Sequence, residues 1–184
     1  MHLNRTIRWS DWNNTGLEHF TLKQGGTLYA VSSVVIGNRE DASYGLHYTM
    51  ELDLNWRTRR FSATLTDGTS RTLVSDGNGN WQDGTGKELE HLRGCLDVDF
   101  AATPFTNTLP IRRLKLAINT AADLNVAYIP VPSLLPEKVD QRYTRRTESS
   151  YLYEGLFRKF TATLEVDEDG FVFDYPETFR RVMG

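Results

Sequence analysis

Apolar and polar residues alternate one for one along several stretches of the chain. The longest such stretch runs from Tyr44 to Trp56, where every even-numbered residue is apolar or aromatic and every odd-numbered residue is small or polar. A period of two is typical of a strand that buries one face. Shorter stretches with the same period cover residues 61–65, 96–100, 124–128 and 160–166. The pattern predicts a mainly β protein.

Turn-forming residues separate the predicted strands. They occur at residues 67–68, 76–79, 84–86 and 167–170, where glycine is combined with Asp, Asn or Thr. Short turns of this kind connect antiparallel strands. A flat sheet of this size would leave one apolar face and two edges uncovered, so it has to curl, close or pack on a second sheet. We therefore expect a strongly curved antiparallel sheet that forms a half-open barrel.

Helix is a minor component of the predicted fold. Pro110 can occupy the first turn of a short helix with Thr108 or Asn107 as its cap, and Pro176 can begin a second one. We expect short helical segments near residues 106–113 and 176–182. No repeat or linker divides the chain, so a single domain over residues 1–184 is the expected organisation.

Charge and cysteine content restrict the partners and the location of the protein. The chain has 21 Lys and Arg against 24 Asp and Glu, and a net charge of −3 provides no basic field for nucleic acid. Cys95 is the single cysteine, and the first residues lack the apolar core of a secretory signal. No apolar run approaches the ~18 residues that a membrane-spanning helix needs. We expect a cytoplasmic protein without a transmembrane segment or a nucleic-acid partner.

The sequence contains no complete catalytic or metal-binding motif. His47 and Glu51, on the polar side of one predicted strand, could act as a general acid–base pair, and Asp97 with Asp99 could act as paired carboxylates. Neither pair is accompanied by a nucleophile or by metal ligands. We expect no catalytic residues, no metal and no cofactor, and an enzyme acting on a small lipid or sugar stays as the alternative.

Residues 95–114 begin as a strand and then change character, because two prolines interrupt strand pairing. Phe105 and Leu109 can turn apolar groups toward a cavity, while Asn107 and the pair Arg112 and Arg113 can meet a polar head group. The arginines have a second possible role, since a guanidinium pairs equally well with a carboxylate of the protein. The sequence leaves both roles open.

Four stretches of the chain resemble the bacterial family of "putative glycolipid-binding" proteins. They are DGNGNWQDG (76–84), DVDFAATPFTNTLPIRRL (97–114), QRYTRR (141–146) and DEDGFVFDYPETFRRV (167–182). The resemblance covers nearly the whole chain. It implies a fold similar to that of the carriers of bacterial lipoproteins and glycolipids, with a cavity for an acyl chain or a glycolipid. It implies no agreed list of binding residues.

The expected function is non-catalytic binding of a lipid or glycolipid in an apolar cavity of the curved sheet. The expected ligand-binding residues are Tyr48, Met50, Leu52, Trp56, Trp81, Phe105, Asn107, Leu109, Arg112, Arg113 and Tyr175. A protein-interaction module that forms a homodimer through a sheet edge or an aromatic patch is the other alternative.

Overall fold

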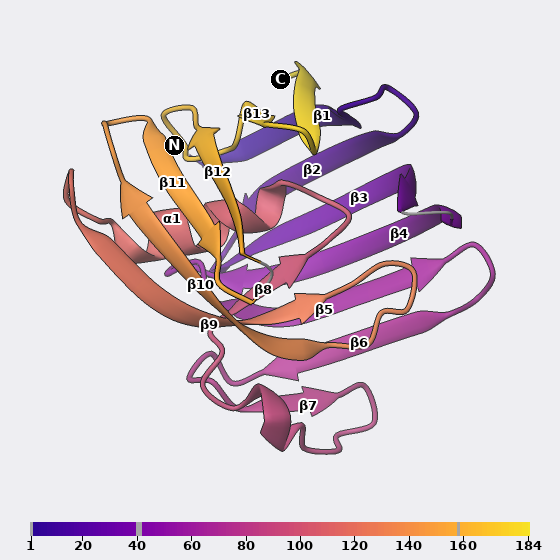
Figure 1. Cartoon of the computed structure of the whole chain (residues 1–184). Helices are drawn as coiled ribbons and strands as arrows, with labels where there is room; N and C mark the ends of the chain where they lie inside the picture. Colours follow the sequence, from indigo (N-terminus) through magenta and orange to yellow (C-terminus); the bar gives the residue numbers. More distant parts are fainter. Residues whose placement is uncertain (1, 40–41, 158) are drawn as a thin grey trace.

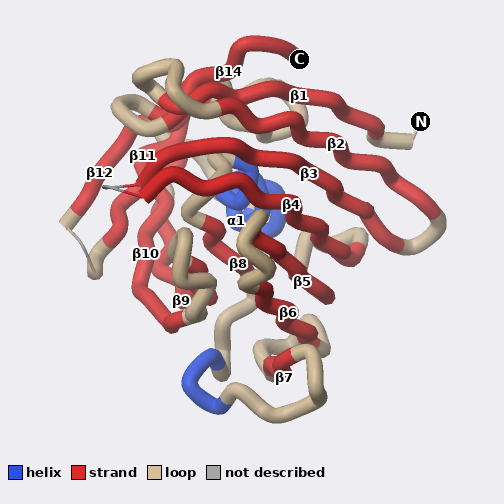
Figure 2. The backbone as a smooth tube through the Cα atoms, turned by 90° about the vertical axis from the view of Figure 1, so that its right-hand side faces the viewer, coloured by secondary structure: helices blue, strands red, loops and turns tan. Residues whose placement is uncertain are grey.

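The computed structural model describes residues 2–39, 42–157 and 159–184. These residues form two β-sheets, one of nine strands and one of five. Figure 1 and Figure 2 show the sheets as two layers that face each other. The prediction of a mainly β, curved fold is confirmed.

The nine-stranded sheet holds the N-terminal half of the chain and the C-terminal strands. Its order is β13-β14-β1-β2-β3-β4-β5-β6-β7, and all its neighbours are antiparallel. The strands are β1 (Asn4–Asp11), β2 (Leu17–Gly25), β3 (Leu28–Arg39), β4 (Ala42–Asp53), β5 (Thr58–Leu65), β6 (Ser70–Ser75), β7 (Trp81–Asp83), β13 (Asp174–Tyr175) and β14 (Phe179–Met183). The longest alternating stretch of the sequence is therefore β4 and the turn that follows it.

The five-stranded sheet is curled into a half-barrel. Its order is β12-β11-β10-β9-β8, and β8 pairs with β9 in parallel while the other neighbours are antiparallel. The strands are β8 (Asp97–Phe100), β9 (Ala121–Ile129), β10 (Glu137–Arg145), β11 (Ser150–Gly155) and β12 (Phe160–Glu165). The chain thus covers the apolar face of the first sheet with a second one.

Within the described ranges, helical structure is confined to three short segments, η1 (Glu90–Leu92), η2 (Phe105–Asn107) and α1 (Thr108–Leu114). The last two follow each other and confirm the helix expected near residues 106–113. Figure 2 shows α1 between the two sheets. None of the helices in the described part of the chain has the length and apolar character to cross a membrane.

The second expected helix, near residues 176–182, is wrong. Residues after the β13–β14 turn form β14, which pairs with β1 so that Arg181 lies opposite Trp9. Glu177 in that turn has a φ of 63°, which is incompatible with a right-handed helix. The local pattern of Pro followed by polar residues suits a helix start, but the edge of β1 offers backbone hydrogen bonds that a helix would forgo.

The inner faces of both sheets form one aromatic-rich core. Tyr48 and Phe100 come from opposite sheets, and their ring centroids are 5.2 Å apart in an edge-to-face arrangement. Phe105 of η2 packs on Phe20 at 4.5 Å. All four rings are fully buried. Burial of such large side chains is the main source of stability in a fold of this type.

Candidate functional site

A cavity of about 280 Å³ lies between the two sheets and is called here the aromatic cavity. Residues of both sheets line it, because Arg39 and Phe179 belong to the nine-stranded sheet and Tyr128 and Tyr153 to the five-stranded one. Its complete lining is Arg39, Asp99, Phe100, Ala101, Thr103, Asn107, Tyr128, Tyr153, Gly155, Phe157, Phe160, Tyr175, Thr178 and Phe179. Seven aromatic side chains in this set make it suited to apolar or ring-shaped groups.

A second cavity, of about 200 Å³, adjoins the first and is called here the polar cavity. The two share Arg39, Ala101, Thr178 and Phe179. The remaining lining is Trp9, Asp11, Trp12, Asn13, Gly16, Leu17, Glu18, Val35, Ile36, Gly37, Asn38, Tyr44, Ala102 and Glu177. An aromatic cavity thus lies next to one that is rich in carboxyl and amide groups.

The rings of the aromatic cavity contact one another. Tyr175 lies 6.0 Å from both Tyr153 and Phe160, measured between ring centroids. On the other side, Tyr128 lies 5.4 Å from Phe157. Because each ring packs on a neighbour, the apolar wall exists before any ligand binds, and little ordering is needed on binding.

Hydrogen bonds within the protein hold the polar groups of this cavity. Asn107 accepts a 2.7 Å hydrogen bond from the Tyr143 hydroxyl and donates one of 3.0 Å to the Pro104 carbonyl. Asp99 accepts a 2.6 Å hydrogen bond from the Gln141 amide. The amide and the carboxylate are therefore fixed in orientation at the cavity wall.

Glu18 is the most unusual residue of the polar cavity, because it carries a carboxyl group and is only 2% exposed on the inner face of the sheet. Its Oε1 accepts hydrogen bonds from Ser33 (2.8 Å) and Tyr48 (2.7 Å). Its Oε2 is buried and forms no hydrogen bond of regular geometry with a described residue, although the Thr103 hydroxyl lies close enough to the carboxyl to lower its pKa. Burial raises the pKa of Glu18 to about 7, although the surrounding hydroxyl groups partly offset this effect.

Two of the residues expected to bind ligand, Asn107 and Tyr175, lie together in the aromatic cavity. Five others lie in the packed core, where each is at most 1% exposed, and line neither cavity: Tyr48, Met50, Leu52, Phe105 and Leu109. They pack between the sheets because β4 turns its even-numbered residues inward and η2 with α1 inserts its apolar side chains between the layers.

Another hollow, of about 320 Å³, is lined by three further expected residues, Trp56, Arg112 and Arg113. The two arginines belong to the last turn of α1, and Trp56 follows β4. The Arg112 guanidinium lies 5.1 Å from the Trp56 ring centroid. Arg113 forms an ion pair with Asp97, whose side chain is fully buried. Arginines in the last turn of a helix also interact favourably with its dipole, so this arrangement has a structural explanation.

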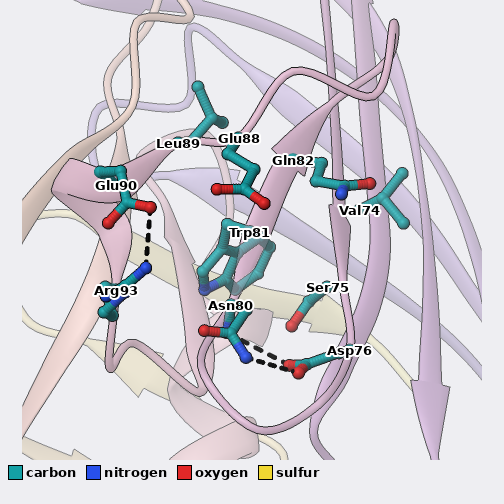
Figure 3. A pocket seen from close by; sticks show the side chains of 10 residues that line it. All are labelled: Val74, Ser75, Asp76, Asn80, Trp81, Gln82, Glu88, Leu89, Glu90 and Arg93. Carbon is teal, nitrogen blue, oxygen red and sulfur yellow. Dashed lines mark hydrogen bonds and ion pairs between the residues drawn. The ribbon is translucent and has the colours of Figure 1, made fainter.

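Trp81, the last of the expected residues, lines a separate hollow of about 270 Å³ beside β7 (Figure 3). Its ring is 3% exposed, and its Nε1 donates a 2.8 Å hydrogen bond to the Cys95 carbonyl. Figure 3 shows that polar groups of this hollow pair with each other, Asn80 with Asp76 and Arg93 with Glu90. These four side chains are therefore already paired within the protein.

Of the four residues considered for catalysis, Asp99 lines the aromatic cavity and the other three line neither cavity. His47 and Glu51 are exposed on the outer face of β4. Asp97 is buried with Arg113, while Asp99 lines the aromatic cavity. Among the residues with described positions, no three His, Cys, Asp or Glu side chains gather as they would around a metal ion.

Sequence reasoning did not identify Glu18, although a signal for it exists. Phe20 and Leu22 are buried on the inner face of β2, and Glu18 is in phase with them. A charged residue at an apolar position of a strand indicates a buried polar group that needs partners. The cavity aromatics at 128, 153, 157, 160 and 179 carry no comparable signal, because aromatic residues in strands usually belong to the core.

Comparison with known proteins supports a family assignment. A family model described as "Putative glycolipid-binding" matches residues 6–181. The crystal structure of a DUF1089 family protein from Pseudomonas aeruginosa is similar, with 39% sequence identity and a TM-score of 0.81. The match covers 90% of this chain and 92% of that one. None of the curated proteins compared with the chain matches it. The chain therefore belongs to the family described as "Putative glycolipid-binding".

Proposed function

We propose that the protein binds a neutral amphipathic molecule of the glycolipid type in the two adjoining cavities, without changing it chemically. The observation that carries this proposal is that an aromatic cavity lies next to a polar one, with four lining residues in common. The description of the family supports a ligand of this class. We also propose that the protein binds this ligand in the cytoplasm.

The chemistry of the two linings suggests how such a ligand is oriented. An alkyl chain gains most from the aromatic cavity, because Tyr153, Phe160 and Tyr175 offer apolar surface that is already in place. A hydroxylated head gains most from the polar cavity, where Asp11, Glu18 and Asn38 supply hydrogen-bonding groups.

The size of the aromatic cavity limits the alkyl part. Its volume of about 280 Å³ is at the lower end of the range for small-molecule sites, which is roughly 300–1,000 Å³. A short chain or one segment of a longer chain fits this space. The rest of a long acyl chain would extend beyond it, or the walls would have to move apart.

Titration with n-octyl β-D-glucoside below its micellar concentration tests the proposal. Trp9 and Trp12 line the polar cavity, so tryptophan fluorescence and calorimetry can both follow binding. Phe160, which is 37% exposed and lines the aromatic cavity, is the residue to change. Phe160→Ala should weaken binding roughly tenfold, because it removes apolar contact with the alkyl chain.

Phe173→Ala is the matched control, since Phe173 is 44% exposed and lines neither cavity. It should bind the glucoside as the unmodified protein does. Equal losses in both variants, or no saturable binding to the unmodified protein, would contradict the proposed function.

A further inference from the structure

The buried carboxyl group of Glu18 is only partly hydrogen-bonded within the protein, because Oε2 has no hydrogen bond of regular geometry. Buried carboxyl groups are normally paired with a cation or fully hydrogen-bonded. In the described part of the chain Glu18 forms no ion pair, and only its Oε1 accepts hydrogen bonds of regular geometry. Oε2 is left without such a hydrogen bond in the wall of a cavity.

The position of Glu18 turns its side chain toward that cavity. Trp9 on β1 and Val35 on β3 are its register partners on either side. All three are buried on the inner face of the sheet, and all three line the polar cavity. A group bound in this cavity would therefore lie beside the carboxyl.

We infer that Oε2 of Glu18 accepts a hydrogen bond from a hydroxyl group of the bound head group, and that this contact selects uncharged, hydroxyl-bearing ligands over anionic ones. The inference rests on the proposed function, because it requires the head group to occupy the polar cavity. A sugar hydroxyl can donate to a carboxylate, whereas a ligand carboxylate has no proton to donate and is repelled.

The other groups around the cavity favour the same selection. Its charged and titratable side chains are Asp11 on β1, Arg39 on β3, Tyr44 on β4 and Glu177 in the β13–β14 turn, and Tyr48 of β4 contacts Glu18 directly. Two of these are carboxylates and one is a guanidinium. Burial raises the pKa of Tyr44 to about 12 and holds that of Tyr48 well above its usual value, so both phenols stay neutral hydrogen-bonding groups.

The proposed contact makes the affinity for the glucoside depend on pH, and the direction of the change can be worked out. With a pKa of about 7, Glu18 is present in both protonation states near neutrality. A hydroxyl that donates to Oε2 stabilises the ionised form, so glucoside binding should strengthen as the pH rises through this value and then level off. Binding of an anion should show the opposite trend.

Calorimetric titration with octyl glucoside and with octanoate, between about pH 5 and pH 9, tests the inference. We expect the glucoside to bind about tenfold more tightly at the high end, as the loss of one charge-assisted hydrogen bond implies. Glu18→Gln should remove the pH dependence and bind the glucoside more weakly at high pH. Circular dichroism checks that this variant folds.

Two further variants test whether the pH dependence of glucoside binding arises from Glu18. Tyr48→Phe removes a hydrogen-bond donor to the carboxylate, so the midpoint of the pH dependence should move upward. Glu165→Gln changes an exposed carboxylate that lines neither cavity, so it should behave as the unmodified protein does.

The outcomes separate the inference from the function on which it rests. Glucoside binding that is independent of pH, that is unaffected by Glu18→Gln, or that is no tighter than octanoate binding would overturn the inference alone. Failure of the unmodified protein to bind the glucoside at any pH would overturn the proposed function and the inference with it.

Discussion

Arg113 donates hydrogen bonds to both carboxylate oxygens of Asp97, a residue whose side chain is completely buried. Burial raises the pKa of Asp97, and the adjacent guanidinium lowers it without fully offsetting the effect. The neighbouring Arg112 instead lies over Trp56. Of the two roles that the sequence left open, the structure shows a structural one for Arg113.

Replacement of each arginine should separate these contacts. Arg113→Met leaves the Asp97 carboxyl buried without its partner, which costs about 3–5 kcal/mol of the free energy of unfolding. Arg112→Met loses a cation–π contact worth about 0.5–2 kcal/mol. Urea unfolding of both variants measures the difference, and an equal loss for the two would contradict the distinction.

Glu18 should make the stability of the unliganded protein depend on pH. Its pKa is raised to about 7 in the folded protein from an ordinary value of 4.5. The carboxyl therefore loses its proton at a lower pH in the unfolded chain than in the folded protein. The free energy of unfolding should fall by about 3 kcal/mol as the pH rises from below the ordinary pKa to above the pKa in the folded protein.

Glu18→Gln removes this titration. The variant should unfold at a higher urea concentration than the unmodified protein above about pH 8 and differ less near pH 4. Unfolding curves at a series of pH values provide the check. Parallel behaviour of the two proteins across this range would show that the carboxyl is not held in its buried state.

Phe105 should contribute to the core rather than to ligand binding. Its ring is fully buried and packs on Phe20 and Phe171. Phe105→Ala should cost about 3–5 kcal/mol of stability, because it leaves a cavity between the sheets. Glucoside affinity of the folded fraction should change much less than in Phe160→Ala. A stable variant with lost binding would place Phe105 at the ligand instead.

The C-terminal strand should depend on Asp167. This carboxylate pairs with Arg181 of β14 at 2.9 Å and with Arg5 of β1 at 2.8 Å. Burial alone would raise the pKa of Asp167, but the hydrogen bond from Arg181 and the other partners outweigh it and lower the pKa. The stabilisation is therefore present above the ordinary pKa and is lost as the pH falls through the folded one.

Asp167→Asn should loosen β14 at neutral pH. Hydrogen exchange of the β14 amides measures this, and protection should fall in the variant and in the unmodified protein at acidic pH. Asp169→Asn is the milder comparison, since Asp169 pairs with Arg5 alone among the ion pairs described and its side chain is 29% exposed. Unchanged protection in Asp167→Asn would contradict the assignment.

Pure protein should show no turnover of chromogenic esterase, glycosidase or phosphatase substrates. The expectation follows from the sequence, which lacks a nucleophile motif, and from the proposed binding function. Glu18 and Asp99 are the carboxyl groups to change if activity is found. Turnover that disappears in Glu18→Gln or Asp99→Asn, with folding intact, would favour the enzyme alternative.

The sequence by itself determined the class of the fold. Alternation of apolar and polar residues predicted β4, β5, β8, β9 and β12, because a half-buried strand imposes a period of two on the residues themselves. Pro110 likewise indicated α1, since its fixed φ suits the first turn of a helix. These signals are local and need no knowledge of distant neighbours.

Tertiary structure decided how the strands are divided, where the C-terminal segment goes and which aromatic rings face a cavity. Residues 179–183 became a strand because the edge of β1 was available to pair with them. Tyr48 and Tyr175 are both tyrosines in strands, yet one lies in the core and the other lines the aromatic cavity. Alternation shows which face of a strand points inward, but whether that face meets packed side chains or an open space depends on the opposite sheet. For the same reason, only the folded chain shows that Oε2 of Glu18 is buried beside a cavity without a hydrogen bond of regular geometry.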